Sequence, residues 1–259
     1  MEVPKKQPPP PHTMASRVAR VAAQDAVARP RRQNCPRCRR ALTVCACRSV
    51  ERALGGRGKV RNKTHVLVLQ DRAEFKRALG SAVVCELALE RCEIKVLFED
   101  LRERGSAVKK PFADGEEKSW GVLWPCDEAT DLSDLGAESG RLRNLIVLDS
   151  TWHRAKAMYY RIPWLSELAK YSISPRKKSN YRIRKQPNEH CLSTAECVSE
   201  ALIALEGEES GAERVSLAFD AMIDDQLDAE LRAFESGPRV KGRPSAVLAR
   251  ERDVRSPSS

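Results

Sequence analysis

The sequence predicts an α/β protein with a mostly parallel sheet and helices on both faces. Residues 145–148 form a short apolar run with the β-branched pair Ile146 and Val147, the composition of a strand covered on both faces. Strand-like and helix-like segments alternate along the chain, as in β-α-β units with right-handed crossovers. With 259 residues, the chain can hold one such domain with additions.

Five short apolar segments are expected to form the sheet. Each is rich in β-branched or aromatic residues and is followed by polar or turn-forming residues. The first two flank a helical pattern and so form one parallel β-α-β unit. The predicted strands cover residues 64–70, 94–98, 120–124, 145–148 and 171–173.

Four segments have apolar residues at helical spacing. The second of them can be capped by Ser150 or Thr151, and the third by Ser193 with Glu196 at the capping-box position. The last has an apolar stripe suited to packing on the sheet. The predicted helices cover residues 73–91, 150–162, 194–205 and 215–234.

The net charge of +10 arises almost wholly before residue 63. Residues 1–62 carry 15 Lys and Arg against 3 Asp and Glu, whereas the remaining 197 residues carry 31 against 33. We interpret residues 1–33 as a disordered, basic, proline-rich leader that attracts a polyanion, and residues 237–259 as a disordered tail. A merely solvated tail is the alternative, and residues 14–33 also resemble an organellar presequence if an internal start is used.

Hydropathy and cysteine content favour a protein without a membrane span in a reducing compartment. No apolar run approaches the ~18 residues of a transmembrane helix, and the start has no secretory apolar region. Nine cysteines in such a chain indicate reduced thiols or metal ligands. The expected location is cytoplasmic or nuclear, with mitochondrial as the alternative.

Four of these cysteines are clustered in sequence. Cys35, Cys38, Cys45 and Cys47 have the spacing C-x2-C-x6-C-x-C, which allows two facing turns to present four sulfurs to one zinc ion. Residues 34–62 are therefore predicted to form a small zinc-ribbon-like element and a linker, with a structural Zn²⁺. Free thiols are the alternative.

Polar residues follow two of the predicted strands. Asp149 ends the central strand, with Ser150 and Thr151 after it, and residues 125–128 form a second polar corner. In open α/β sheets, ligands bind where strand ends and helix N-termini converge. In the alternative interpretation, Asp149 only caps the helix and Trp152 fills the core.

A basic run occupies residues 174–187. It contains Tyr181 and no acid, which suits a loop that contacts phosphates near a ligand site. A solvated charged face is the alternative. Its six cations are Arg176, Lys177, Lys178, Arg182, Arg184 and Lys185.

Beyond the cysteine cluster, several motifs occur in a recognisable order: L-W-P-C-D-E-A at residues 123–129, L-D-S-T-W-H-R-A-K at 148–156, Y-R-I-R-K-Q-P at 181–187 and L-S-T-A-E at 192–196. With them the chain resembles the DTW-domain family of tRNA-uridine aminocarboxypropyltransferases. Two positions depart from similar members, which often carry His where Asp71 stands and Gly or Ser where Cys126 stands.

The resemblance implies a catalytic domain over residues 63–236 with a SPOUT-like, trefoil-knotted fold. It also implies transfer of the 3-amino-3-carboxypropyl group of S-adenosylmethionine to N3 of a tRNA uridine. The partner is then tRNA, and a homodimer is possible because related knotted enzymes often dimerise. A SPOUT-type RNA methyltransferase and a non-catalytic, zinc-containing RNA-binding protein are the alternatives.

The resemblance and the motif positions also assign site residues. A carboxylate near N3 can act as general base. The expected catalytic residues are Asp149, Thr151 and Trp152. Donor binding is expected from Leu123, Trp124, Pro125, Asp127, Ser150, Leu192, Ser193 and Thr194. Substrate contacts are expected from Arg154, Lys156, Arg182, Arg184 and Lys185.

Overall fold

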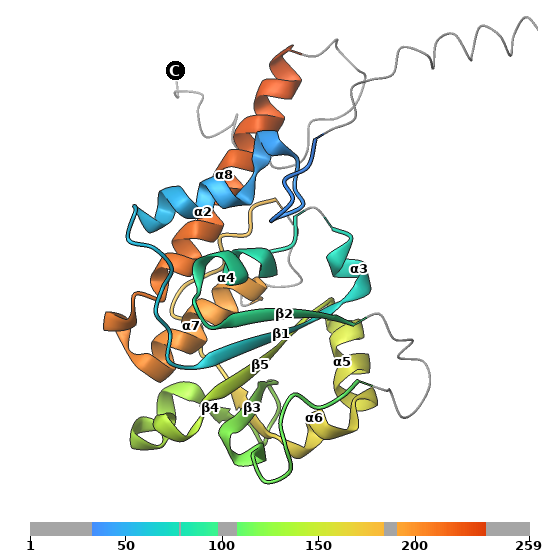
Figure 1. The fold of residues 1–259 in the computed structure, drawn as a ribbon, viewed down its shortest axis with the longest axis vertical. Coiled ribbons are helices and arrows are strands. Elements are labelled where there is room, and N and C mark those ends of the chain that lie inside the picture. Colours follow the sequence, from blue (N-terminus) through green and yellow to red (C-terminus); the bar gives the residue numbers. More distant parts are fainter. Residues whose placement is uncertain (1–32, 78, 98–107, 184–190, 237–259) are drawn as a thin grey trace, which may run out of the picture. The chain divides into compact units, whose positions relative to one another are not determined.

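The structure is a computed structural model that describes residues 33–77, 79–97, 108–183 and 191–236 (Figure 1). The predicted leader, except for Gln33, and the predicted tail lie outside the described residues, as do Arg184 and Lys185. No helix in the described ranges is both long enough and apolar enough to cross a membrane.

The described strands form one six-stranded sheet in the order β2-β1-β5-β3-β6-β4, and every pairing between them is parallel. The strands are β1 (His65–Asp71), β2 (Cys92–Leu97), β3 (Trp120–Leu123), β4 (Thr130–Asp131), β5 (Asn144–Asp149) and β6 (Ala169–Ser172). The α/β class and the parallel sheet predicted from the sequence are confirmed, while the trefoil knot stays a prediction.

Helices cover both faces of the sheet because alternate residues of the central strands are apolar on both sides. Val66 and Val68 of β1 join an apolar cluster with one set of helices, and Leu67 and Leu69 join a second cluster on the other face. The first set is α4 (Ala82–Ala88), α7 (Thr194–Glu206) and α8 (Glu213–Ser236), and the second is α5 (Trp152–Arg161) and α6 (Pro163–Glu167).

The prediction of a single helix over residues 73–91 is wrong. The segment forms α3 (Arg72–Phe75) and the separate α4, and the chain between them contains Gly80, which disfavours a continuous helix. Asp71 starts α3 by accepting a hydrogen bond from the N–H of Ala73 at 2.6 Å. The helix predicted over 150–162 also ends early, at Arg161, because Pro163 begins α6.

The second pair of clustered cysteines begins a helix, α2 (Ala46–Leu54), rather than a second turn. Short 3₁₀ turns complete the described structure: η1 (Leu42–Val44), η2 (Glu117–Ser119), η3 (Leu132–Asp134), η4 (Gly136–Arg141) and η5 (Glu208–Ser210).

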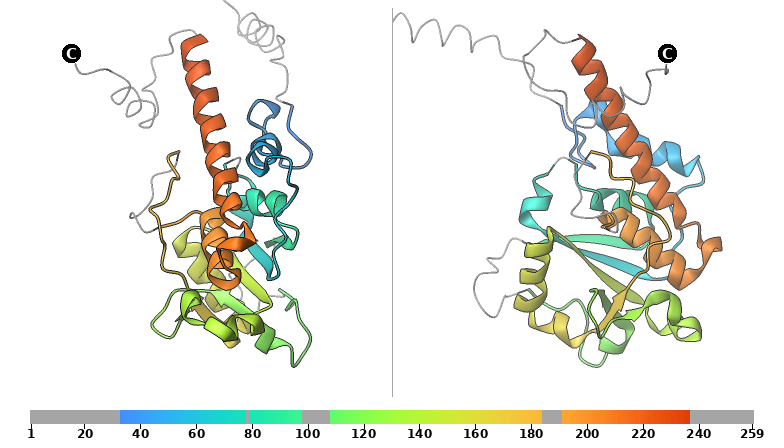
Figure 2. Two further views of the ribbon diagram at one scale, coloured as in Figure 1. Left: turned by 90° about the vertical axis from the view of Figure 1, so that its left-hand side faces the viewer. Right: turned by 180° about the vertical axis from the view of Figure 1, so that it is seen from behind.

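Helix α2 lies beside α8, although the two are far apart in sequence (Figure 2). The Ser49 hydroxyl donates to Asp225 Oδ2 at 2.6 Å, and Arg52 donates to both oxygens of the same carboxylate. Arg40 Nη2 donates to Gln226 Oε1 at 2.8 Å. These contacts attach the cysteine-containing segment to the C-terminal helix.

Gly121 in β3 is required by close packing. A Cβ at this position would lie 2.3 Å from Tyr171 Cε2 and 2.9 Å from Leu142 Cδ1. We expect Gly121→Ala to lower the free energy of unfolding by about 1–3 kcal/mol, the usual cost of overpacking. Urea unfolding measures this. Gly140→Ala is the matched control, because no atom lies within 4 Å of its Cβ position and it should unfold like the parent protein.

Candidate active site and metal centre

A cleft of about 460 Å³ opens at the carboxyl ends of β3, β5 and β6, where the start of α7 also contributes. This is the edge at which open α/β sheets bind ligands. Seven of the residues predicted from the sequence line it: Leu123, Trp124, Pro125, Ser150, Trp152, Leu192 and Thr194. The structure therefore brings together three motifs that are separate in sequence.

Aromatic side chains form one wall of the cleft. Trp152 is 49% exposed and its ring centroid lies 6.2 Å from that of Trp124. Trp124 is itself held by stacking on Tyr159, with centroids 4.3 Å apart and the planes at 4°. Trp152 is therefore not a core side chain, and its indole face is available to a ligand in the cleft.

Asp149 is buried and both of its carboxylate oxygens are occupied. Oδ2 accepts a hydrogen bond from Gln70 Nε2 at 2.8 Å, and Oδ1 accepts one from Thr194 Oγ1 at 2.5 Å. Helix α5 begins after Thr151, and no side-chain capping bond is made there. Asp149 therefore connects β1, β5 and α7 instead of capping α5, and its hydrogen-bond partner Thr194 lines the cleft.

Two serines near the cleft differ in how their hydroxyls are used. Ser193 is buried and forms the predicted capping box of α7, in which its Oγ accepts from the N–H of Glu196 and its own N–H donates to the Glu196 carboxylate. Ser150 Oγ is buried in the cleft wall and has no hydrogen-bond partner in the described part of the chain. A bound ligand can supply that partner.

Asp127 and Thr151 do not line the cleft. Asp127 is exposed beyond β3, and Thr151 occupies the position before α5. Cys197 and Ala155 line the cleft but were not among the predicted residues. Burial raises the pKa of the Cys197 thiol to about 12, so this thiol stays neutral and is a poor nucleophile.

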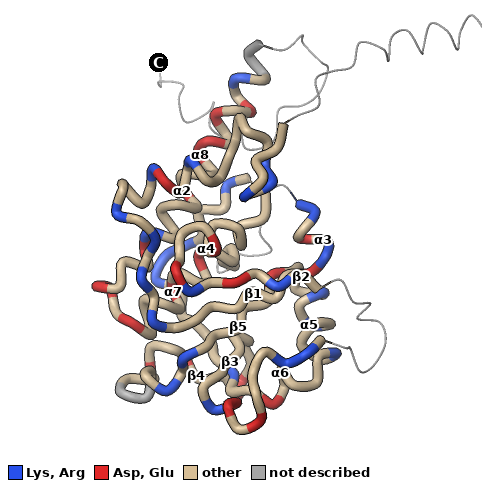
Figure 3. The backbone as a smooth tube through the Cα atoms, in the orientation of Figure 1, with Lys and Arg blue, Asp and Glu red and all other residues tan. Residues whose placement is uncertain are grey.

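The basic run faces acids from other elements. Arg176 pairs with Glu200 at 2.9 Å and with Glu208 at 2.8 Å, and Arg182 pairs with Asp224. Figure 3 shows that the described chain carries Asp and Glu positions interspersed with its Lys and Arg positions. The run has no acid within itself, and only the tertiary structure reveals these neighbours.

The other two predicted substrate contacts lie on α5. Arg154 pairs with Asp71 Oδ1 at 2.5 Å, which gives Asp71 a structural partner in this chain. Lys156 is exposed. Both cations lie on the helix that begins at the cleft with Trp152.

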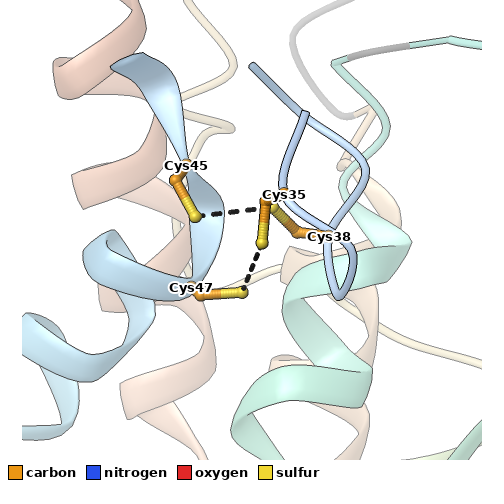
Figure 4. A group of neighbouring side chains, drawn as sticks. All are labelled: Cys35, Cys38, Cys45 and Cys47. Atoms are coloured by element: carbon orange, nitrogen blue, oxygen red, sulfur yellow. Dashed lines mark hydrogen bonds between the residues drawn. The ribbon is translucent and has the colours of Figure 1, made fainter. Parts of the chain in front are cut away.

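The four clustered cysteines converge on one point (Figure 4). Sγ of Cys35 lies 3.8 Å from Sγ of Cys47, Sγ of Cys38 lies 3.7 Å from Sγ of Cys45, and all four sulfurs are within 4.8 Å of one another. A tetrahedral ion with metal–sulfur bonds of ~2.3 Å requires sulfurs ~3.8 Å apart. The arrangement therefore fits a metal ion held by four thiolates.

The surroundings of Cys35 and Cys47 shift the pKa values of these two thiols in opposite directions. Backbone N–H groups of Cys38 and Arg37 lower the pKa of Cys35 to about 6. Burial, followed by the neighbouring Cys35, raises the pKa of Cys47 to about 12. A bound cation is what allows crowded, buried thiols to ionise together.

Comparison with known proteins identifies the family of the chain. The DTW domain family matches residues 32–227. The tRNA-uridine aminocarboxypropyltransferase 2 of Drosophila melanogaster is 30% identical over 178 residues, which are 68% of this chain and 68% of the fly protein. The Mus musculus protein of that name is 30% identical over 179 residues, 68% of this chain and 57% of the mouse protein. No solved structure matches. The extent of the family match shows that the chain belongs to the DTW-domain family.

Proposed function

We propose that the protein transfers the 3-amino-3-carboxypropyl group of S-adenosylmethionine to N3 of a tRNA uridine. The observation that best supports this proposal is the cleft at the carboxyl ends of β3, β5 and β6, which is lined by two family motifs and the start of α7. The fly and mouse relatives, named as tRNA-uridine aminocarboxypropyltransferases, support the same reaction.

The cleft has the chemistry to hold the donor. Its volume of about 460 Å³ lies in the usual range for small-molecule sites. Trp152 and Trp124 offer aromatic surface for an adenine ring, and the unpartnered Ser150 hydroxyl offers a polar contact. We assign donor binding to these residues together with Leu123, Leu192 and Thr194, which line the same cleft.

The reaction needs a group that accepts the N3 proton. When bound, the donor supplies an electrophilic γ-carbon: the N3–carbon bond forms as the carbon–sulfonium bond breaks, and methylthioadenosine leaves. Thr194 lines the cleft and donates its hydroxyl proton towards the buried Asp149 carboxylate. Thr194 Oγ1 can therefore take the N3 proton while passing its own to Asp149, which makes Asp149 the final acceptor.

The acceptor uridine must present N3, which lies on the base-pairing edge, so the base is unpaired or flipped out. We assign contacts with RNA phosphates near the cleft to Lys156 and Arg154, on the helix that begins at Trp152, and Arg154 must exchange its ion pair with Asp71 to make them. Arg182 has Asp224 as an alternative partner, so its contact with RNA requires exchange of that ion pair.

We also propose that the four-cysteine cluster binds a structural Zn²⁺. Four protein ligands complete a tetrahedral coordination and leave no position for substrate. The cluster belongs to α2 and the preceding turn, which are fastened to α8 through Asp225 and Gln226. The ion would therefore hold this segment against the C-terminal helix.

Trp152→Ala is expected to weaken donor binding by roughly 10-fold, because it removes an aromatic face from the cleft wall. The protein's stability should change little, since Trp152 is 49% exposed. Isothermal titration with S-adenosylmethionine and urea unfolding measure the two effects. Leu217→Ala is the control, because this large apolar residue is 52% exposed and does not line the cleft. Unchanged donor affinity in Trp152→Ala would remove Trp152 from the site.

The by-product distinguishes the proposed reaction from its alternatives. Chromatography of a reaction with unmodified tRNA should show methylthioadenosine accumulating in proportion to modified tRNA. S-adenosylhomocysteine instead would mean methyl transfer, and neither product together with tight RNA binding would mean a non-catalytic binding protein. Either result would reject the proposal.

A further inference from the structure

A second hollow, of about 280 Å³, lies at the carboxyl end of β1, the strand beside β5 in the sheet. One wall comes from the cysteine-containing loop, through Asn34, Cys38 and Arg39, and the other from the segment that contains α3, through residues that include Phe75 and Lys76. The hollow is thus at the same edge of the sheet as the candidate active site, with different lining residues.

Gln70 connects the two sites. Its side chain lines the hollow and is only 4% exposed, and it lies in register with Asp149 on the neighbouring strand. The Asp149 carboxylate only accepts hydrogen bonds, so it fixes the amide with Nε2 towards itself at 2.8 Å. Gln70 Oε1 is then a buried acceptor without a partner among the described residues. A buried acceptor that loses its hydrogen bonds to water and gains none in return is destabilising, so an N–H donor in the hollow would be favoured.

The rest of the hollow has the chemistry of a nucleotide site. The guanidinium of Arg39 lies 3.9 Å from the centre of the Phe75 ring, which forms a flat cationic surface. Lys76 is exposed beside it, and Arg77 pairs with Glu74 at 3.2 Å. Three cations against one acid suit a phosphate, and stacking surfaces of this kind are typical of sites that hold unpaired bases.

We propose that this hollow binds a nucleotide of the RNA next to the acceptor uridine. A base N–H donates to Gln70 Oε1, the base stacks on the Arg39–Phe75 pair, and Arg39 and Lys76 contact a phosphate. This inference rests on the proposed function, which identifies the bound RNA as tRNA. It gives the cysteine-containing element a second role, because its loop supplies Arg39 to the site.

The test combines Arg39→Asn with Lys76→Ala in the full-length protein. Asn suits position 39 because the backbone there has φ of 61°, a conformation that Asn tolerates. Fluorescence anisotropy with a labelled, unmodified tRNA transcript should show roughly 10-fold weaker binding and a salt-dependence slope smaller by about 1.4, for two lost phosphate contacts. Affinity for S-adenosylmethionine should stay the same.

The matched control replaces Lys109 and Lys118 with Ala, which removes two exposed positive charges that line neither site. A second measurement cross-links a 4-thiouridine transcript to the parent protein, and the cross-linked peptide should contain Phe75. Equal losses of affinity in the variant and the control, or no loss in either, would overturn the subsite, as would cross-links that avoid this peptide. If the variant binds tRNA more weakly than the control and the cross-linked peptide contains Phe75, but no aminocarboxypropyl product forms, the proposed reaction fails and the nucleotide site stands.

Discussion

Asp149→Asn is expected to slow aminocarboxypropyl transfer by ~10²–10⁴-fold, the range that a positioned general base contributes. Asn cannot accept the proton that Thr194 passes on. The local structure should survive, because Asn Oδ1 can still accept from Thr194 and the Gln70 amide can turn to present its oxygen to Asn Nδ2. Single-turnover rates on tRNA measure the loss, and titration with S-adenosylmethionine should show donor affinity within a few-fold of the parent protein.

Variants of Thr194 separate the proton pathway from simple packing. Thr194→Ser keeps the hydroxyl that bonds Asp149 Oδ1 and should retain most activity, whereas the nearly isosteric Thr194→Val should lose transfer to about the same extent as Asp149→Asn. Combining Thr194→Val with Asp149→Asn should add little further loss, because both act in one step. Undiminished transfer in Asp149→Asn would mean that Asp149 only ties β1, β5 and α7 together.

Replacing Cys35 and Cys38 together with Ser is expected to remove the bound zinc and to lower the free energy of unfolding by about 4 kcal/mol or more, as is usual when a structural metal is lost. The turn with these two cysteines would no longer be tied to α2. The contacts of Ser49 and Arg52 with Asp225 on α8 would then weaken as well. Metal analysis of the purified protein and thermal unfolding measure the two effects.

The same variant should retain its affinity for S-adenosylmethionine if enough of it remains folded, because the cysteine loop contributes nothing to the donor cleft. Its affinity for tRNA should fall, since Arg39 follows Cys38. Cys126→Ser is the control: this cysteine is exposed and outside the cluster, so zinc content and stability should not change. Absence of any metal from the purified parent protein would refute the zinc assignment.

Local composition was sufficient to predict five of the six strands of the described sheet and the three helices α5, α7 and α8, whereas the two-residue strand β4 is too short to show a pattern. The apolar run of β5 and the capping-box residues Ser193 and Glu196 each specify an element without help from the rest of the chain. The break between α3 and α4 was missed because the helical periodicity continues across it. Helix α2 was missed because the metal-binding spacing of its cysteines was interpreted as a turn, and the packing of α2 on α8 is not visible in sequence.

Site residues were predictable where their motifs lie at strand ends. They were unpredictable where their hydrogen-bond or ion-pair partners come from elements distant in sequence. Trp152, Ser150 and Thr194 follow from motif position and do line one cleft. Gln70 could have been found from its place at the end of β1, because parallel neighbours end at the same edge of a sheet. The pairing of Arg182 with Asp224 could not have been found in the same way, since the acid belongs to a helix about 40 residues further along the chain.

The most direct test of the proposed function is the product itself. Purified protein is incubated with S-adenosylmethionine and unmodified tRNA, and the tRNA is digested for nucleoside mass spectrometry. We expect a uridine that has gained the 3-amino-3-carboxypropyl group at N3, and this nucleoside should form ~10²–10⁴-fold more slowly with Asp149→Asn. Methyluridine, or only unmodified uridine under conditions where the donor demonstrably binds, would contradict the assignment.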